Sequence, residues 1–432
     1  MHDPSARRVH TPPGTVARLI ARVGIRAVLA VHWALVRAAG SLVRQRPSAS
    51  PARVLLTGTF HADGWIAAHL GPLAASPHCA EVLMVTTSPL PPLAKVKAVH
   101  PPRWLARGIG GVGARLATFV WLALRTRPDV VGGFHLLING LVAQLAARAS
   151  GARALYFCVG GPTEFAGGGY AGENAYFARL GTPDARVERM LLRAALDFDD
   201  IVTMGTGAAA YFGARGARAR VHTIGGAIDP ARFRPGDAAP DFDVVFVGRL
   251  VPIKRVDRLI GAIALAAETL PGLRAAIVGD GPLRDRLEHL AQERGIRERI
   301  TFAGRSGDVA AWLRRSRVFV LTSASEGLAL SLMEALMCHL PAVVPDVGDL
   351  RDLVEDGVNG FLIDPPSDRA FADAIVQVLA EPARYSRYRA AAGARSTSYM
   401  PQQIALRWEG PLTAGEEHAS TSSAAHSGGA AV

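Results

Sequence analysis

Short apolar runs alternate with longer segments of helical periodicity over most of the chain, beginning near Pro51. Each run has the length of a buried strand, and in the segments between them apolar residues recur every three or four positions. This alternation predicts an α/β fold with parallel sheets and crossover helices. In the first half, strands are expected at 54–56, 82–86, 128–134, 154–159 and 201–204, and helices at 65–75, 141–150 and 185–196.

The alternation is interrupted once. Asp229 to Asp243 contains three prolines and no apolar periodicity, which predicts a linker. Beyond it, strands are expected at 244–247, 275–278, 300–302, 318–321 and 342–344, and helices at 256–268, 283–294, 309–315, 328–338 and 370–379. The pattern therefore indicates two doubly wound, Rossmann-like domains facing each other across a cleft, which suits a chain of 432 residues.

Domain boundaries follow from these changes in pattern. The expected organisation is a basic extension, an acceptor-side domain, a donor domain, a helical segment packing back on the first domain, and a small, polar, disordered tail. The corresponding ranges are 1–50, 51–235, 241–381, 382–412 and 413–432.

Positive charge is concentrated at the start of the chain. The net charge is +11, but residues 1–128 contain sixteen Lys or Arg and only three acids, so the remainder is close to neutral. Between Pro13 and Arg46 there is no acidic residue, and five arginines fall in one sector of a helical wheel. Such a basic amphipathic helix is typical of a membrane surface.

A second basic, apolar stretch with Trp104 and Trp121 supports a membrane partner. We expect peripheral contact with anionic lipid through residues 15–46 and 93–127, on the cytoplasmic face of the membrane. The first segment is not expected to span, because its longest uncharged run, Ala27–Val36, has ten residues. It lacks the cleavage site of a signal peptide; a disordered arm or a misassigned start remain alternatives. Nucleic acid is not expected, since few aromatic residues alternate with basic ones.

Three cysteines (Cys79, Cys158 and Cys338) are widely spaced and show no metal-type pairing. They predict buried thiols in a reducing compartment.

Two glycine motifs and two acidic motifs are weak signals. Neither Gly108–Gly113 nor Gly167–Gly172 has the preceding strand that a dinucleotide fingerprint needs, so both are interpreted as flexible loops. Asp197–Asp199 and Asp241–Asp243 directly precede strands, where carboxylates commonly face solvent. No metal site and no cofactor are therefore predicted.

The first strand of the second domain ends in Gly248, Arg249 and, five residues later, Lys254. A guanidinium and an ammonium at the carboxyl end of a strand suit a phosphate ligand. The next strand ends at Gly279 and Gly281, where small residues allow a ligand to come close.

A stronger feature lies at residues 323–338. Glu326 is expected at the mouth of the cleft, and Glu334 about two turns into an otherwise apolar helix. A buried carboxylate needs donors, and ribose hydroxyls can supply them. The amides of Gly327, Leu328 and Ala329, at the helix N-terminus, suit a diphosphate.

These motifs, in this order, resemble the retaining family 4 glycosyltransferases of the GT-B fold. The resemblance rests on G-R-L-x-x-x-K at Gly248–Lys254, E-x7-E at Glu326–Glu334, and the closing text from Pro341 to Leu362. It implies a nucleotide-diphosphate sugar as donor, with Arg249 and Lys254 neutralising the diphosphate, Glu326 contacting the sugar and Glu334 the ribose. It also implies retention without a metal ion, and a lipid-linked or glycan acceptor is expected from the basic first domain.

The first domain departs from the family pattern. Gly64 ends a loop that lacks the usual paired glycines, and the strand at 154–159 is not followed by the histidine that many members have. His135 is the candidate for the acceptor side, with Glu164 and His61 as alternatives.

Other functions remain open at this stage. A nucleotide-sugar epimerase or hydrolase of the same fold shares the donor site. A non-catalytic membrane scaffold predicts loss of the donor residues, all four of which are present.

Overall fold

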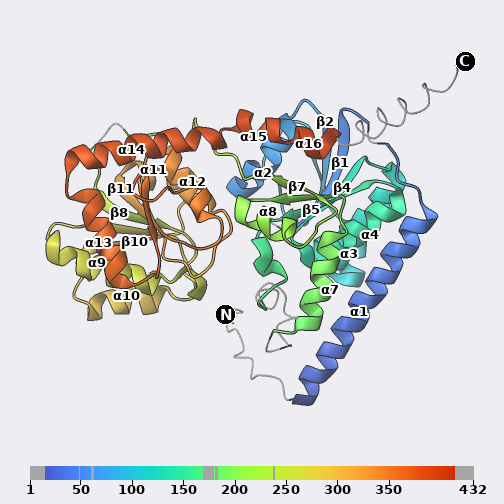
Figure 1. The fold of residues 1–432 in the computed structure, drawn as a ribbon, viewed down its shortest axis with the longest axis horizontal. Coiled ribbons are helices and arrows are strands. Elements are labelled where there is room, and N and C mark those ends of the chain that lie inside the picture. Colours follow the sequence, from blue (N-terminus) through green and yellow to red (C-terminus); the bar gives the residue numbers. More distant parts are fainter. Residues whose placement is uncertain are drawn as a thin grey trace, which may run out of the picture.

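The computed structural model describes residues 15–47, 49–59, 63–168, 180, 183–236 and 239–413. Two α/β domains lie side by side, each with a parallel sheet between helices (Figure 1). The doubly wound, two-domain class expected from the sequence is confirmed. The tail at 414–432 and the start at 1–14 are outside the described residues.

The first sheet has seven strands in the order β3-β2-β1-β4-β5-β6-β7, and every pair is parallel. Because strand order reverses at β1, the carboxyl ends of β1 and β4 form a switch point, where ligands of such sheets bind. The strands are β1 (Ala52–Thr57), β2 (Cys79–Val85), β3 (Val96–Val99), β4 (Val130–Phe134), β5 (Arg153–Cys158), β6 (Asp200–Thr203) and β7 (Arg220–Thr223).

The second sheet has six strands in the order β10-β9-β8-β11-β12-β13, also parallel throughout. Its switch point lies between β8 and β11. The strands are β8 (Phe242–Val247), β9 (Ala275–Val278), β10 (Ile300–Gly304), β11 (Ser316–Val320), β12 (Ala342–Pro345) and β13 (Gly360–Ile363). Beyond charged residues at their starts (Arg53, Arg153 and Asp243), the central strands are mostly apolar because helices cover both faces.

Helices join and cover these strands. In the first domain they are α1 (Thr15–Leu42), α2 (Asp63–Ala75), α3 (Arg103–Thr126), α4 (Leu141–Ser150), α7 (Ala185–Leu196) and α8 (Thr206–Gly213). In the second they are α9 (Val256–Thr269), α10 (Arg284–Glu293), α11 (Val309–Arg314), α12 (Leu330–Met337) and α13 (Asp368–Leu379), followed by α14 (Pro382–Ser396), α15 (Pro401–Arg407) and α16 (Glu409–Thr413).

The interpretation of Gly108–Gly113 as a flexible loop was wrong. These residues lie within α3, whose backbone bends only at Gly110, with φ 76°. The helix forms because its apolar residues recur at helical spacing and bury Phe119 and Leu122 on the first domain. Of the second motif, Gly169–Gly172 lies outside the described residues.

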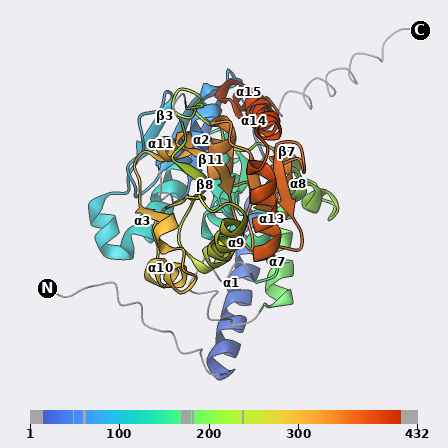
Figure 2. The same cartoon turned by 90° about the vertical axis from the view of Figure 1, so that its left-hand side faces the viewer.

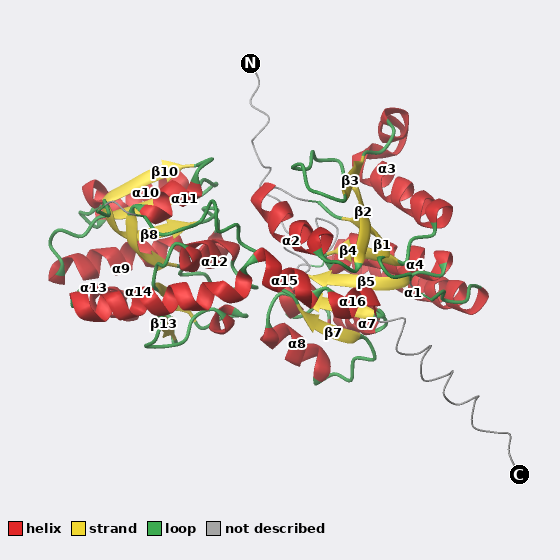
Figure 3. Cartoon of the chain, turned by 90° about the horizontal axis from the view of Figure 1, so that it is seen from above, coloured by secondary structure: helices red, strands yellow, loops and turns green. Residues whose placement is uncertain are grey.

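The C-terminal segment crosses between the domains (Figure 3). α14 packs on α12 and α13 and so belongs to the second domain, whereas α15 packs on α2 of the first. Trp408 follows α15 and is fully buried, with its ring 5.6 Å from that of Phe157. The return to the first domain therefore begins about fifteen residues later than the expected start at 382.

The domains also meet at the N-terminus of α8. Asp352 of the second domain accepts from the backbone N–H and the hydroxyl of Thr206, both at 2.5 Å, and Asp349 accepts from Ala208 N–H at 3.2 Å. Gly205 precedes this helix and has no side chain to cap it, so the cap comes from the other domain. A Cβ at Gly205 would lie 2.3 Å from Asp349, which makes a side chain there incompatible with the contact.

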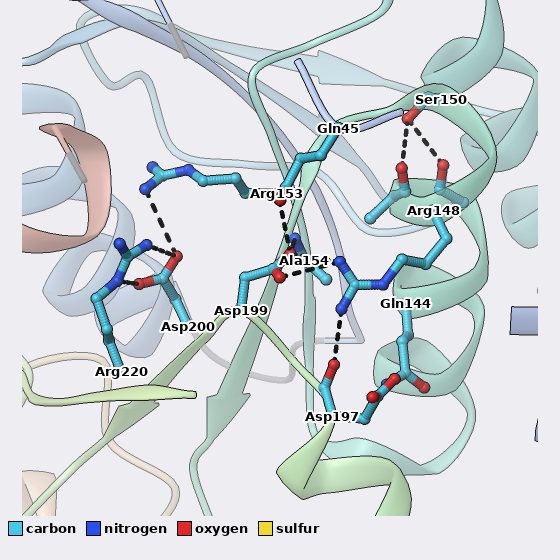
Figure 4. A network of polar contacts seen from close by, with 12 residues as sticks. Gln45, Gln144, Arg148, Ser150, Arg153, Ala154, Asp197, Asp199, Asp200 and Arg220 are labelled. Atoms are coloured by element: carbon cyan, nitrogen blue, oxygen red, sulfur yellow. Dashed lines mark hydrogen bonds and ion pairs between the residues drawn. The ribbon is translucent and has the colours of Figure 1, made fainter. Parts of the chain in front are cut away.

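The Asp197–Asp199 string has a structural role (Figure 4). Asp199 binds the Arg148 guanidinium at 2.8 Å and accepts from Ala154 N–H at 2.7 Å. Next to it, the fully buried Asp200 pairs with Arg153, Arg220 and His222. Burial alone would raise the pKa of Asp200, but the hydrogen bonds from His222 and Arg220 hold it below its usual value.

This network also fastens the C-terminus. Arg153 is itself buried and donates to the backbone carbonyl of Pro411 in α16.

The second acidic string, Asp241–Asp243, is also paired. Asp241 and Asp243 pair with Arg315 and Arg317 at the amino-terminal ends of β8 and β11. Asp199, Asp241 and Asp243 thus pair with arginines, whereas the Asp197 carboxylate accepts from the Gln144 side-chain amide at 3.3 Å.

All three cysteines are buried free thiols, as expected. Burial raises the pKa of Cys79 to about 11 and that of Cys338 to about 12, so both stay protonated at neutral pH.

Asp200→Asn is expected to destabilise the first domain by about 3 kcal/mol, because it leaves the buried Arg153 charge without its carboxylate. The thermal midpoint should fall by roughly 5 °C or more. Asp241→Asn is the matched control: its ion pair is exposed, so the loss should stay below about 1 kcal/mol. Equal midpoints for the two variants would contradict this role of Asp200.

Candidate functional site

The loops that follow β8 and β11 meet at the switch point of the second sheet. Lys254 ends the first loop and donates to Glu326 of the second, with 2.5 Å between Nζ and Oε1. The Ser323 hydroxyl donates to the same Oε1, also at 2.5 Å. Only 9% of the Glu326 side chain is exposed, so two donors hold this carboxylate in one place.

Further hydrogen bonds join the same two loops. The Thr322 hydroxyl donates to the carbonyls of Lys254 and Arg255, and Ala324 N–H donates to the Ile253 carbonyl. Arg255 adopts φ 47°, which turns the chain sharply into α9. These bonds fix the position of Lys254 beside Glu326.

Arg249 lies on the same loop and is exposed. Within the described part of the chain its guanidinium has no ion pair. The site thus presents one cation that is paired and one that is available to an anionic ligand.

Gly248, Gly279 and Gly281 bring backbones together at this edge. A Cβ at Gly279 would lie 1.8 Å from the Gly248 carbonyl oxygen, and one at Gly281 would lie 2.4 Å from that of Leu250. Gly279 also has φ 142°, a conformation that favours glycine. The close packing of the loops is enough to explain why glycine stands at these positions. Their contact with a ligand stays a prediction.

Helix α12 begins at Leu330, two residues later than expected. Gly327, Leu328 and Ala329 therefore precede its first turn and lie in a bend against the first domain. A Cβ at Gly327 would lie 2.8 Å from the Val159 carbonyl, and the Leu328 side chain fills the space beside Gly225. These residues form part of the boundary between the domains.

Glu334 lies in the second turn of α12 among buried apolar residues, including Leu332, Met333 and Ala335. Desolvation raises the pKa of its carboxyl to about 7, with Arg232 opposing the shift only in part. A ligand that donates hydrogen bonds to this carboxyl would offset the free-energy cost of burying it.

The first-domain candidates lie at the opposite switch point. Gly64 is at the start of α2, and a Cβ there would meet nothing within 4 Å. His135 directly follows β4 and is 31% exposed, whereas Glu164 is buried and binds the His135 ring. Glu164 is therefore a partner of His135 and no substitute for it. His61 lies outside the described residues.

Comparison with known proteins identifies the second domain. Residues 228–395 match the family model of glycosyl transferases group 1. The second domain is thus similar to group 1 glycosyltransferases. Among curated relatives, the chain is 36% identical to a D-inositol 3-phosphate glycosyltransferase of Thermomonospora curvata, over 41% of this chain and 43% of the relative. It is 33% identical to an exopolysaccharide phosphotransferase of Streptomyces coelicolor, over 45% of this chain and 21% of the relative.

The chain spans less than half the length of these two relatives. Solved structures extend the likeness to the whole fold. HepE of Anabaena in complex with UDP is 19% identical with a TM-score of 0.65, covering 84% of this chain and 100% of that one. Sucrose-phosphate synthase of Thermosynechococcus elongatus is 19% identical with a TM-score of 0.68, covering 86% and 100%. The second domain is thus the second half of a GT-B fold.

Sequence reasoning missed several groups around this site. Nothing in the sequence indicates that Tyr156 and two backbone N–H groups bind Glu164. Tyr156 resembles any strand residue, and backbone groups carry no sequence pattern. Asp349 and Asp352, which cap α8, lie within the Pro341–Leu362 motif, where they were not singled out. Only spatial proximity reveals these roles.

Glu334→Gln is expected to stabilise the unliganded protein at alkaline pH. A carboxyl whose pKa is about 7 when folded and near 4.5 when unfolded lowers stability progressively as pH rises between those values. The variant should raise the thermal midpoint at pH 8 by about 2 °C or more, with a smaller gain at pH 5. Glu293→Gln, at an exposed position, is the control. A midpoint difference independent of pH would contradict the raised pKa.

Proposed function

We propose that the chain is a glycosyltransferase that moves a sugar from a nucleotide-diphosphate sugar to a lipid-linked or glycan acceptor. One observation carries the proposal: Lys254 and Glu326 are hydrogen-bonded to each other at the switch point of the second domain, and the exposed Arg249 lies on the same loop as Lys254. This arrangement offers cations to a leaving diphosphate and a carboxylate to a sugar.

In the proposed reaction the bond between the anomeric carbon and the diphosphate oxygen breaks, and its electron pair leaves with the diphosphate. Arg249 and Lys254 stabilise that developing charge. Glu326 binds hydroxyls of the transferred sugar, and Glu334 binds the ribose. We infer attack from the face that the diphosphate leaves, which retains the anomeric configuration, and no metal ion or cofactor.

The relatives support a role in polysaccharide assembly. Their names include an exopolysaccharide phosphotransferase and a Vi polysaccharide biosynthesis protein of Salmonella typhi, and HepE was solved with UDP-glucose. A uridine diphosphate sugar is therefore the first donor to test, beside guanosine and adenosine diphosphate sugars.

Arg249→Ala and Lys254→Ala are each expected to lower kcat by about 10²-fold or more, because each removes a cation from the developing charge. Binding of UDP, GDP and ADP by thermal shift selects the donor, and labelled sugar nucleotide with the organism's own membranes measures transfer. Arg258→Ala, on the outer side of α9, is the matched control and should transfer at the rate of the unaltered protein.

Donor-only incubation separates the rival activities. Free sugar or an epimerised donor formed as fast as transfer would assign a hydrolase or an epimerase. Nucleotide binding without turnover by the unaltered protein would favour a scaffold.

We further propose that the first domain contacts the cytoplasmic face of the membrane. The support is the outward face of α1, which projects beyond the rest of the domain (Figure 2). Apolar side chains cover that face: Val16, Leu19, Ile20, Val23, Val28, Val31, Leu35 and Leu42 are all at least half exposed.

The arginines of α1 have a different role from the one expected. Arg22 and Arg26 point inward to Asp184, the cap of α7, while Leu29 and Val36 pack on the domain. The apolar side of the helix therefore faces outward. By length and composition, residues Arg18–Leu42 also suffice to cross a membrane, which revises the expectation based on the ten-residue uncharged run. The bonds to Asp184 favour a helix that lies in the surface.

Helix α3 adds basic and aromatic side chains to the proposed membrane-contacting surface. Trp104 and Trp121 are exposed on it, together with Arg103, Arg107 and Arg125. Indole rings prefer the headgroup region, and arginines attract anionic lipid. α4 packs against both α1 and α3, so the two helices flank the same part of the domain.

The triple variant Ile20→Glu, Val23→Glu, Val31→Glu is expected to bind phosphatidylglycerol-containing vesicles at least tenfold less than the unaltered protein, because three carboxylates replace apolar side chains at the lipid. Flotation measures this. Val358→Glu, at an exposed apolar position in the second domain, should float normally. If the triple variant floats as well as the unaltered protein, α1 is not the lipid-binding surface. If light scattering shows that the unaltered protein is a dimer and the triple variant is a monomer, the apolar face of α1 binds a second copy of the chain instead.

A further inference from the structure

The loop that follows β12 packs against the main chain at Glu326. It runs from Asp346 to a short 3₁₀ turn, Leu350–Asp352. Gly348 lies in this loop with φ 59°, and a Cβ there would be 1.9 Å from the Glu326 carbonyl oxygen. Because backbone packs directly on backbone at this point, a shift of the loop would displace the main chain at Glu326.

The same loop is bonded to α8, at the edge of the first domain that faces the second (Figure 1). Asp352 accepts from the backbone N–H and the hydroxyl of Thr206, both at 2.5 Å, and Asp349 accepts from Ala208 N–H at 3.2 Å. Among the residues that the structure describes, neither carboxylate forms an ion pair, and Asp349 is only 4% exposed. Hydrogen bonds from α8, aided by the positive end of its dipole, therefore compensate the burial of Asp349.

Two glycines at the start of α8 leave room for this contact. A Cβ at Gly205 would lie 2.3 Å from the Asp349 Cβ, and one at Gly207 would lie 2.7 Å from Asp349 Oδ1. Neither backbone conformation requires glycine, since Gly205 is extended with φ −142° and Gly207 lies within the helix. A helix by itself favours Ser, Thr, Asn or Asp at the first of these positions and disfavours glycine at the second. The start of α8 is thus suited to contact with the second domain more than to the stability of the helix itself.

The loop also binds the segment through which the chain returns to the first domain. The Asp352 carbonyl accepts from the Arg395 guanidinium and from the Tyr399 hydroxyl, the latter at 3.3 Å. The Tyr399 carbonyl accepts in turn from Ile228 N–H at 3.0 Å, in the segment that leads from the first domain to the second. Residues 349–352 therefore connect α8 with both crossings of the chain.

We propose that Asp349 and Asp352 are positioning residues of the transfer reaction, because their cap on α8 sets the orientation of the two domains and holds the main chain at Glu326 against the first domain. With the cap in place, a donor bound to the second domain presents its anomeric carbon to an acceptor on the first. Without the cap the donor still binds, because all of its candidate ligands belong to the second domain, but the two substrates are misaligned. A misplacement of about 1 Å can lower a rate by about 10²-fold. This assignment rests on the proposed glycosyl transfer.

The decisive variant is Gly205→Ser. A serine gives α8 a cap of its own, so the helix keeps its stability, but the serine Cβ meets Asp349 and breaks the contact between the domains. Gly205→Ser and Asp352→Ala are each expected to lower kcat by about tenfold or more, while binding of the nucleotide diphosphate selected by thermal shift is unchanged. Asp352→Asn keeps an acceptor oxygen for Thr206 and should retain most of the activity.

The matched control is Asp373→Ala, which removes an exposed carboxylate whose partner Arg369 lies in the same helix. Distances between spin labels supply a readout that does not depend on turnover. The three native cysteines are buried, so labels attach to cysteines introduced by Ala117→Cys in α3 and Glu293→Cys in α10, both at exposed positions. The distance distribution should shift or broaden with Gly205→Ser and Asp352→Ala, and should stay unchanged with Asp373→Ala.

A cap that only stabilises α8 predicts a different result. Gly205→Ser would then keep the kcat and the label distances of the unaltered protein, and Asp352→Ala would lower only the thermal midpoint; this result would overturn the proposal. Label distances that shift while kcat stays constant would also reject a positioning role. If the unaltered protein transfers no sugar but both variants still shift the label distances, the proposed glycosyl transfer is rejected and the cap remains the determinant of domain orientation.

Discussion

The parallel order of both sheets is the constraint on which the site depends. In a parallel sheet all carboxyl ends lie on one edge, and where strand order reverses, adjacent loops diverge and leave room for a ligand. Here β8 and β11 supply Lys254 and Glu326, and β4 and β5 supply His135 and Glu164. Two edges built in the same way therefore deliver four polar residues to one boundary between domains.

That boundary is held by few polar contacts. Asp349 and Asp352 cap α8, and the contact of Gly327 with Val159 leaves no space for a side chain. Since α14 remains on the second domain while α15 and Trp408 belong to the first, the chain crosses at residues 397–400. The cap on α8 lies next to Glu326 in space, because a Cβ at Gly348, beside Asp349, would lie 1.9 Å from the Glu326 carbonyl oxygen. A movement that breaks this cap would therefore also disturb the geometry at Glu326.

The sequence predicted the regular elements well, for a physical reason. Buried parallel strands are largely apolar runs, and the residues that follow their carboxyl ends are local in sequence, so the positions of Arg249, Lys254 and Glu326 in the loops could be predicted from spacing. The donor roles of these residues and of Glu334 rest on the resemblance and stay predictions. Gly108–Gly113 was misassigned because glycines weaken a helix, yet α3 gains enough from packing Phe119 and Leu122 to include them. The start of α12 was placed too early because the apolar run begins in a bend at the domain boundary, before the helix itself.

Roles that depend on a partner far away in the sequence could not be predicted from the sequence. Nothing local indicates that Glu164 accepts from His135, twenty-nine positions away, or that Arg22 and Arg26 turn inward to Asp184. The second case reverses a conclusion drawn from a helical wheel, since the wheel shows which residues share a face but not which way the face points. With Arg22 and Arg26 turned inward, the outward surface of α1 is mostly apolar, although Arg37 is exposed as well. Its association with lipid would then depend on burial more than on charge. Binding through α1 should then survive high salt, whereas binding through the arginines of α3 should not.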